Sequence, residues 1–219
     1  TLEGYEADDI LGTVAKHCQA EGIEVSIVSG DRDLLQLADE HIKIRIPKTS
    51  RGTTNIYDYY PDDVKREYQV TPTEFIDVKA LMGDTSDNIP GVPSIGEKTA
   101  TNLIVSYGSI ENAYAHVDEI KPPRAQKALS EYYDMAQMSK ELATICITCP
   151  IPFSYEEALI GNLYTPEAFK FMKRMEFKSI LNRFDSASME DKENGPQKSF
   201  KEVTDKKEAE KIFKAAEKA

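Results

Sequence analysis

No apolar run in this sequence approaches the ~20 residues that span a bilayer, so we expect no membrane partner. A signal peptide is also missing, because the opening residues, TLEGYEADDI, are acidic instead of basic and then apolar. Glycine and proline number only 11 each, which excludes collagen-like and low-complexity proteins. The three cysteines are an odd count, so a disulfide framework is not expected and a reducing cytoplasm fits better.

A surplus of basic residues is missing as well. The 219 residues include 27 Lys and Arg against 38 Asp and Glu, which gives a formal net charge of -11. Net acidity ordinarily argues against a nucleic-acid partner. A site that holds metal ions must itself be acidic, however, so the placement of the carboxylates decides between the two interpretations.

The N-terminal part of the sequence alternates helical and extended patterns. Apolar spacing predicts a helix at 5–20, a strand at 24–29, a short helix at 34–38 and a strand at 42–46. This order predicts an α/β domain with a largely parallel sheet. The polar residues 48–55 are expected to form a turn region.

Helical patterns dominate the middle of the chain. Thr71 and Pro72 have the residue types of an N-cap and of a first helical position. An extended segment is expected at 141–148. The predicted helices are 61–68, 72–82, 96–107, 109–116, 123–139 and 165–175, the last with a continuation over 177–184.

Residues 185–198 contain almost no apolar side chains, which is typical of a linker. After them, 199–219 begins with a strand pattern at 200–203 and continues with a helical pattern at 205–219, like the opening of another domain. The chain also lacks an initiator Met and starts in mid-pattern. We therefore expect a fragment cut at both ends, with one main domain over 1–184.

Three carboxylate clusters lie at boundaries of the predicted elements. Asp31 and Asp33 follow the carboxyl end of a strand, where open α/β sheets place their ligands. If the clusters converge, their mutual repulsion favours hard divalent cations with oxygen ligands, and two such ions about 4 Å apart hydrolyse phosphodiesters. Each cluster alone has a structural explanation, since acids favour a helix's first turn and cap helices, but the three together are harder to explain in this way. The clusters are Glu6-Ala-Asp8-Asp9, Gly30-Asp31-Arg-Asp33 and Gly83-Asp84-Thr-Ser-Asp87-Asn88.

A glycine-punctuated segment opens the helix predicted at 96–107. Its residues are Gly91-Val-Pro-Ser-Ile-Gly96-Glu-Lys98-Thr-Ala100. Glycine lets the backbone approach a partner closely, and free N–H groups at a helix N-terminus bind phosphate, which Lys98 is placed to reach as well. The segment therefore predicts a helix-hairpin that grips a nucleic-acid backbone without reading bases. A tight helix–helix turn is the structural alternative.

Taken together, three segments resemble the structure-specific 5′ nucleases, and most closely the 5′–3′ exonuclease domain of bacterial DNA polymerase I. The resemblance covers residues 4–184, and 200–219 resembles the start of the next polymerase I domain, a 3′–5′ exonuclease-like one. It implies an α/β nuclease core with a partial parallel sheet, and a helical helix–three-turn–helix subdomain that binds DNA. The segments are Glu6-Ala-Asp-Asp9, Gly30-Asp-Arg-Asp33-Leu-Leu-Gln-Leu37 and Lys79-Ala-Leu-Met-Gly-Asp-Thr-Ser-Asp-Asn-Ile-Pro-Gly-Val-Pro-Ser-Ile-Gly-Glu-Lys-Thr-Ala100.

The resemblance implies a metal-dependent enzyme that cuts 5′-flap, nicked or branched DNA in replication and repair, as a monomer in the bacterial cytoplasm. It implies two divalent ions, Mg2+ or Mn2+, and a K+ ion held by backbone carbonyls of the hairpin. The residues implied to hold the duplex are Gly91, Val92, Pro93, Ser94, Ile95, Gly96, Lys98 and Thr99. The implied metal ligands are Glu6, Asp8, Asp9, Asp31, Asp33, Asp84 and Asp87, of which Asp9, Asp31, Asp33 and Asp84 are expected to be catalytic.

A further metal-binding Asp and a basic helical arch of this family have no counterpart in the sequence. We therefore expect the isolated chain to bind duplex DNA weakly and to cleave almost none. Two other functions stay open: a DNA-binding module without chemistry, and a metal-dependent ribonuclease with an incidental hairpin. Cys146-Ile-Thr-Cys149 is a solitary C-x-x-C motif without a nearby His, so we interpret it as a packed extended segment and not as a zinc site.

Overall fold

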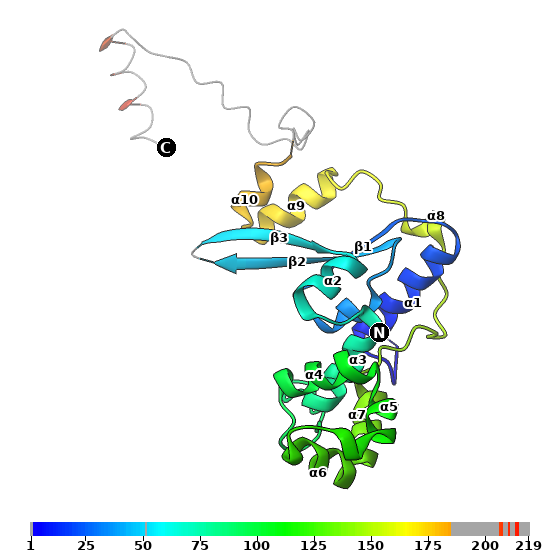
Figure 1. Cartoon of the computed structure of the whole chain (residues 1–219). Coiled ribbons are helices and arrows are strands. Elements are labelled where there is room, and N and C mark those ends of the chain that lie inside the picture. Colours follow the sequence, from blue (N-terminus) through cyan, green and yellow to red (C-terminus); the bar gives the residue numbers. More distant parts are fainter. Residues whose placement is uncertain (1, 51, 185–205, 208–209, 211–212, 215–219) are drawn as a thin grey trace. The chain divides into compact units, whose positions relative to one another are not determined.

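The structure is a computed structural model that describes residues 2–50, 52–184, 206–207, 210 and 213–214 (Figure 1). The chain divides into two compact units, Thr1–Phe153 and Ser154–Ala219. The linker expected at 185–198 and the strand expected at 200–203 lie outside the described residues. Most of the helix expected at 205–219 lies outside them too.

The first unit begins with a small α/β part. Within the described residues its sheet has the strand order β1–β2–β3, with β1 parallel to β2 and β3 antiparallel to β2. Val25 lies opposite Ile42 in the parallel pair, and Ile44 lies opposite Tyr59 in the antiparallel pair. The elements in order are α1 (Ala7–Ala20), β1 (Val25–Val28), the 3-10 helix η1 (Asp33–Leu37), β2 (Ile42–Ser50) and β3 (Thr53–Tyr59).

The expectation of a polar turn region over 48–55 is wrong, and the sheet is mixed instead of largely parallel. β2 runs on to Ser50 and returns as β3, with the Thr49 and Thr54 hydroxyls 2.9 Å apart across the ladder. Only Tyr59 of β3 is buried, so the strand lacks the alternation of apolar and polar residues that reveals a half-buried strand. The backbone pairing of this exposed hairpin therefore left no hydrophobic pattern to read.

Helices make up the rest of the first unit, and those predicted at 61–68 and 72–82 are confirmed. At the start of α3 the Thr71 hydroxyl accepts the N–H of Glu74 at 3.3 Å, while the Glu74 carboxylate accepts the N–H of Thr71 at 2.8 Å. This reciprocal pair is a capping box, which fixes where the helix begins. The helices are α2 (Pro61–Tyr68), α3 (Pro72–Met82), α4 (Glu97–Tyr107), α5 (Ile110–Ala115), η2 (Val117–Glu119), α6 (Pro123–Glu131) and α7 (Tyr133–Ala143).

The single helix predicted over 123–139 is two helices, and the extended segment predicted from 141 begins later. The break is at Tyr132, whose φ of -120° and ψ of 30° are not helical. No Gly or Pro marks this position. The rings of Tyr132 and Tyr133 pack against the core, so tertiary packing ends α6 and starts α7. Helix α7 then continues to Ala143.

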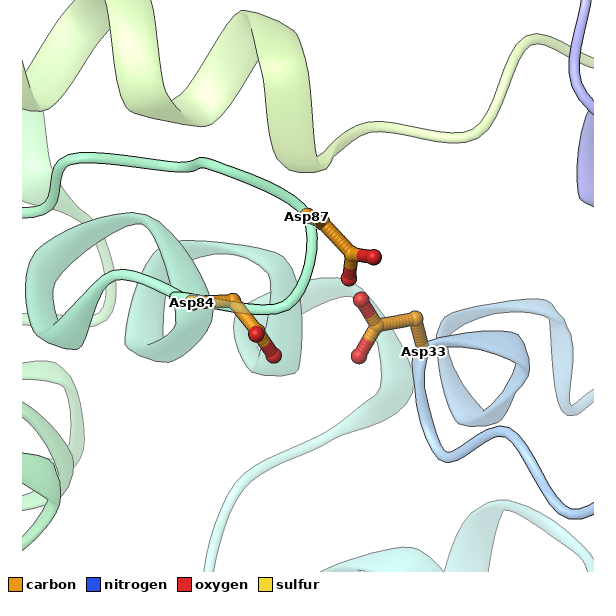
Figure 2. Close-up of side chains that lie close together, drawn as sticks. All are labelled: Asp33, Asp84 and Asp87. Carbon is orange, nitrogen blue, oxygen red and sulfur yellow. The ribbon is translucent and has the colours of Figure 1, made fainter.

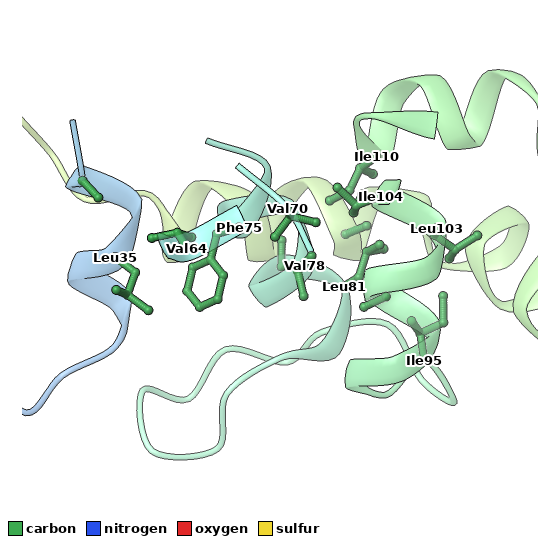
Figure 3. Packing of buried hydrophobic residues seen from close by; sticks show 14 of the residues in the cluster. Leu35, Val64, Val70, Phe75, Val78, Leu81, Ile95, Leu103, Ile104 and Ile110 are labelled. Carbon is green, nitrogen blue, oxygen red and sulfur yellow. The ribbon is translucent and has the colours of Figure 1, made fainter. Parts of the chain in front are cut away.

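A continuous apolar core runs from η1 through α3 to α4 (Figure 3). Leu35 of η1, Phe75 and Leu81 of α3, and Ile104 of α4 are all buried in it. Burial of side chains of this size stabilises a fold by roughly 1.5–3 kcal/mol each. Helix α3 is thereby held between η1 and α4, which fixes the ends of these elements relative to one another.

The described part of the second unit contains α8 (Tyr155–Ala158), α9 (Pro166–Arg174) and α10 (Lys178–Leu181). The Thr165 hydroxyl accepts the N–H of Ala168 at 3.2 Å, as predicted for a helix that begins there. The ring of Phe184 packs edge-on against Tyr164 and Phe169, with centroids 5.1 and 5.5 Å away. Within the described residues of the whole chain, every helix is too short or too polar to span a membrane.

Candidate metal centre

Three of the predicted carboxylates meet beside α3 (Figure 2). Asp33 opens η1, just after β1, while Asp84 and Asp87 lie on the loop that follows α3. One carboxylate oxygen from each lies within 4.8 Å of those of the other two. Ligand oxygens stand about 2.0–2.6 Å from Mg2+ or Ca2+, so oxygens this close are able to share an ion. All these donors are carboxylate oxygens, which suits a hard divalent cation.

Two glycines hold the loop that carries Asp84 and Asp87. Gly83 and Gly91 have φ values of 74° and 66°, and a Cβ on Gly91 would lie 2.5 Å from the Gly83 nitrogen. Only glycine allows both the positive φ and the contact between the two backbones. Asp84 and Ile89 exchange backbone hydrogen bonds of 2.9 and 2.8 Å just inside this contact. The loop therefore enters and leaves the fold at one point, which we call the glycine neck.

Lys79 of α3 lies against two of the three carboxylates. Its Nζ is 2.7 Å from Asp33 Oδ1 and 2.5 Å from Asp84 Oδ2, and only 11% of its side chain is exposed. The backbone N–H of Ser86 donates to Asp84 Oδ1 at 2.8 Å, and the Ser86 hydroxyl donates to the same oxygen. The Lys79 and Ser86 hydrogen bonds hold the pKa of Asp84 far below its usual range. Burial instead raises the pKa of Asp33, despite the opposing effect of Lys79.

Asp87 differs from its two neighbours. It is exposed, and in the part of the chain that the structure describes no hydrogen bond or ion pair reaches its carboxylate. It is close enough to Asp33 for its charge to raise the pKa of that carboxyl. Asp87 is therefore available to a ligand without breaking a contact.

The cluster at the start of α1 divides between two environments. Burial, and then the charges of Asp31 and Asp33, raise the pKa of Asp8 to about 6, so Asp8 faces the same negative field as the loop cluster. Asp9 accepts the N–H of Cys146 at 2.8 Å through Oδ1 and that of Glu6 at 2.9 Å through Oδ2. Both carboxylate oxygens of Asp9 are thus engaged by backbone N–H groups. Glu6 is exposed and is the N-cap residue of α1.

The Cys146-x-x-Cys149 segment packs along α1. The N–H of Cys149 donates to the Thr13 hydroxyl at 3.0 Å, and all three cysteines of the chain are free thiols. Cys149 is buried, whereas Cys146 is partly exposed. This arrangement agrees with a packed segment that anchors the start of α1.

One cavity of about 1000 Å3 unites the loop cluster with the predicted hairpin. Its lining includes Asp31, Asp33, Asp84 and Asp87, and Lys79, which pairs with two of them. Lys98, Thr101 and Asn102, which share a face of α4 at helical spacing, line it as well, and so do the apolar Phe75, Val78 and Met82. The carboxylates and the first turns of α4 therefore border the same space.

The hairpin 91–99 separates anchoring residues from exposed ones. Val92 and Ile95 are buried in the core, and the N–H of Ile95 closes a turn onto the Val92 carbonyl at 3.0 Å. Exposed Ser94 has a φ of 72°, and its hydroxyl accepts a 3.0 Å hydrogen bond from Arg124. Gly96 is the N-cap of α4, and a Cβ placed on it would meet nothing within 4 Å.

The remaining predicted hairpin residues fall on either side of this division. Pro93 and Lys98 are exposed, Thr99 is half-buried and Gly91 belongs to the glycine neck. The open surface is therefore Pro93, Ser94, Gly96 and Lys98, while Val92 and Ile95 serve as anchors.

Several residues of the site were not found from the sequence. Lys79 is the first residue of the third motif, but its contact with the site was not predicted. It lies in the last turn of α3, five residues before Asp84, and a lysine side chain is long enough to reach that carboxylate. Thr101 and Asn102 follow Lys98 at helical spacing, which is a usable signal. Buried Ser139, whose hydroxyl accepts the Gly91 N–H at 3.1 Å from 48 residues away, has no local signal at all.

The comparisons with known proteins cover most of the chain. A family model described as 5'-3' exonuclease, N-terminal resolvase-like domain, matches residues 1–69. A second, described as 5'-3' exonuclease, C-terminal SAM fold, matches residues 70–165. The predicted combination of an α/β core with a helical subdomain is thereby confirmed.

The curated relatives are long proteins. The chain is 43% identical over 190 residues to DNA polymerase I of Bacillus caldotenax, which covers 87% of this chain and 21% of that protein. It is 42% identical over 206 residues to DNA polymerase I of Bacillus subtilis (strain 168), covering 93% and 23%. The chain thus spans about a fifth of the length of these relatives.

Solved structures show the same fold. T5 5′-exonuclease with bound zinc ions aligns with a TM-score of 0.57 and 25% identity, over 67% of this chain and 52% of that one. A complex of the bacteriophage T5 D15 flap endonuclease with DNA and metal ions aligns with a TM-score of 0.57 and 21% identity, over 84% and 60%.

Proposed function

The chain belongs to the 5′–3′ exonuclease family, and from this premise we propose that it is the nuclease part of a DNA polymerase I, hydrolysing phosphodiester bonds of branched or nicked DNA in replication and repair. One observation carries the proposal. The ligand atoms of Asp33, Asp84 and Asp87 gather within 4.8 Å, in a cavity that Lys98 also lines. A carboxylate cluster suited to metal ions and a cationic helix start suited to phosphate therefore border one space.

The proposed centre holds two divalent ions, Mg2+ or Mn2+. Asp33, Asp84 and Asp87 would hold the ions most closely, and Asp8 and Asp31 would add carboxylates from α1 and from the turn after β1. Glu6 and Asp9 would complete the set, although both Asp9 oxygens already accept backbone N–H groups. When bound, such ions activate water and stabilise the leaving oxygen. The side chains hold and orient the ions, and none acts as a nucleophile.

The hairpin 91–99 is the proposed grip on duplex DNA behind the cut. Its exposed Ser94, Gly96 and Lys98 contact phosphates, whereas Val92 and Ile95 keep the backbone in place from the core. Phosphate contacts carry no base information, so binding is independent of sequence. We propose that carbonyls of this hairpin also hold K+, which predicts tighter duplex binding in KCl than in LiCl at equal ionic strength.

The remaining family features follow the same premise. We also propose that the protein works as a monomer. The relatives are bacterial, which supports a cytoplasmic location. We propose that residues 1–184 belong to the nuclease domain, that 185–198 link it to the next domain, and that 199–219 begin that domain.

The test uses the longest polypeptide that the gene encodes, with a 5′-flap DNA substrate. Cleavage should require Mg2+ or Mn2+ and should stop with a chelator. Asp87→Asn should lower it at least about 100-fold without loss of stability, because electrostatic groups at such sites contribute on that scale and Asp87 has no contact to lose. Asp118→Asn, at an exposed acid of η2, is the matched control. Cleavage that survives the chelator would reject the metal mechanism, and duplex binding without cleavage would favour the DNA-binding module.

A further inference from the structure

Lys79 presents its ammonium to two of the three carboxylates that could hold a divalent ion. Its Nζ lies 2.7 Å from Asp33 Oδ1 and 2.5 Å from Asp84 Oδ2. We propose that Lys79 is a positioning residue that competes with divalent ions for Asp33 and Asp84, and so sets the metal affinity of the centre. The inference rests on the proposed function, since it concerns the same carboxylates.

The competition follows from how the oxygens of Asp84 are used. Oδ2 is paired with Lys79, and Oδ1 accepts both the N–H and the hydroxyl of Ser86. These three donors leave one lone pair of the Asp84 carboxylate, on Oδ2, so an ion that takes Asp84 as a ligand must either bind beside the Lys79 ammonium or displace one of the donors. Asp87, in contrast, has no such partner within the described residues. An ion is thus able to enter on the Asp87 side at once, but it gains Asp84 only against the lysine.

The location of Lys79 explains why this competition does not simply lock the site. Its ion pairs border the cavity, where the negative charge exceeds what Lys79 offsets even together with Arg32 and Lys98. The further acids that line it are Asp31, Glu67, Asp87 and Glu97. A divalent ion brings twice the charge to the same oxygens and relieves more of this repulsion. A monovalent ion brings no more charge than the ammonium already does. Lys79 therefore disfavours binding of monovalent cations. It also holds Asp33 and Asp84 close together, so that a divalent ion is able to replace it between them.

The experiment measures Mn2+ binding to the 219-residue chain by electron paramagnetic resonance, which distinguishes free from bound ion. Lys79→Met should bind Mn2+ about tenfold more tightly than the natural chain, because it removes both of the partly buried ion pairs that compete with the ion. Lys79→Arg retains the charge and should restore the natural affinity. Unchanged or weaker binding by Lys79→Met would overturn the inference.

Two controls separate competition from general effects. Lys98→Met removes one positive charge from the same cavity without touching the carboxylates, so it should change affinity less than about twofold. Lys140→Met removes a lysine that bridges Asp77 and Glu111 away from the cavity, and should leave Mn2+ binding unchanged. If Lys98→Met tightens binding as much as Lys79→Met, long-range charge and not competition is the cause, and the inference fails.

A second measurement needs no variant and holds even if Lys79→Met does not fold. An amine-acetylating reagent, read by mass spectrometry, should label Lys79 faster when Mn2+ is present, because the ammonium has left the carboxylates. Labelling of Lys140 should not change. Equal or slower labelling of Lys79 would overturn the inference while leaving the metal centre intact. A natural chain that binds no Mn2+ at millimolar concentration would instead overturn the proposed function, and the inference with it.

Discussion

Two lysines bridge pairs of carboxylates along α3, and they do so in different surroundings. Lys79 joins Asp33 and Asp84, while Lys140 of α7 joins Asp77 of α3 and Glu111 of α5, at 2.7 and 2.9 Å. Asp77 is almost fully buried and also accepts the N–H of Ile110 at 3.4 Å. Lys79 and its partners line the 1000 Å3 cavity together with four more acids, Asp31, Glu67, Asp87 and Glu97.

A lysine between two carboxylates is therefore not by itself evidence of a functional site. Around Lys140 the charges serve packing, because they join α3, α5 and α7 over a buried aspartate. Around Lys79 the same chemistry leaves an excess of negative charge that faces an open space. Burial and neighbouring charge, and not the motif, separate a structural bridge from a site.

The largest expected difference between the two lysine bridges is in catalysis, and it is tested by neutralising one aspartate of each bridge. In the longest polypeptide that the gene encodes, Asp84→Asn should lower 5′-flap cleavage by about 1000-fold, because it removes a charge that acts directly on the reaction. Asp77→Asn should leave cleavage within about threefold below its unfolding temperature. Similar losses in both variants would show that the two bridges do not differ in role.

The same two variants should also differ in stability. Lys79 and Ser86 hold the pKa of Asp84 far below its usual range, so its charge stabilises the folded chain at neutral pH, and Asp84→Asn should cost about 2 kcal/mol of unfolding free energy. Burial raises the pKa of Asp77, so its charge is kept at a cost, and Lys140 retains Glu111 as a partner; Asp77→Asn should therefore cost less than about 1 kcal/mol. Urea unfolding of the 219-residue chain with a chelator present measures both. A larger loss for Asp77→Asn would contradict the effect of burial on Asp77.

Gly91 of the glycine neck and Gly96 at the start of α4 should differ in their effect on stability. Gly91→Ala forces a Cβ against the Gly83 backbone at a positive φ, and should cost about 2 kcal/mol in urea unfolding. Gly96→Leu has open space for its side chain, so it should unfold like the natural chain.

Duplex binding should respond in the opposite way at Gly96. Its leucine variant places a side chain where a phosphate would approach, and should bind two unrelated duplexes several-fold more weakly, and equally so, in fluorescence anisotropy. A loss limited to one duplex would indicate base recognition and contradict the backbone grip.

The smallest expected effect concerns Asp8 and pH. Its pKa is raised to about 6, so between about pH 4 and pH 6 the folded chain binds more protons than the unfolded chain. The free energy of unfolding therefore falls as the pH rises through this window. With a chelator present, Asp8→Asn should match the natural chain near pH 4 and exceed it by about 1 kcal/mol at pH 7, after allowance for partial exposure. If the stability difference between Asp8→Asn and the natural chain does not change with pH, Asp8 does not share the negative field of Asp31 and Asp33.

The sequence predicts much of the helical part because its signals are local. Thr71, Pro72 and Glu74 define a helix start within four residues, and the predicted bounds of α2 and α3 agree with the structure. The hairpin of β2 and β3 escaped prediction because its stability lies in backbone pairing at an exposed edge. The break at Tyr132 escaped because packing and not residue type causes it.

The candidate site was predictable as a set of residues, but not as an arrangement. Asp33, Asp84 and Asp87 were named from their motifs, yet nothing in the spacing showed that Lys79 pairs with two of them. Asp9 was taken as one more ligand, whereas its oxygens accept N–H groups from Glu6 and from Cys146, 137 residues away. Such contacts depend on the tertiary fold, which a single sequence does not reveal.

The glycine neck has a consequence for protein engineering. Because Gly83 and Gly91 bring the two ends of the intervening loop into backbone contact, the loop is in effect an interchangeable cassette. A graft of different length or acidity between these glycines would leave α3 and the start of α4 where they are. The metal preference of the centre should therefore be adjustable by loop exchange, without redesign of the surrounding fold.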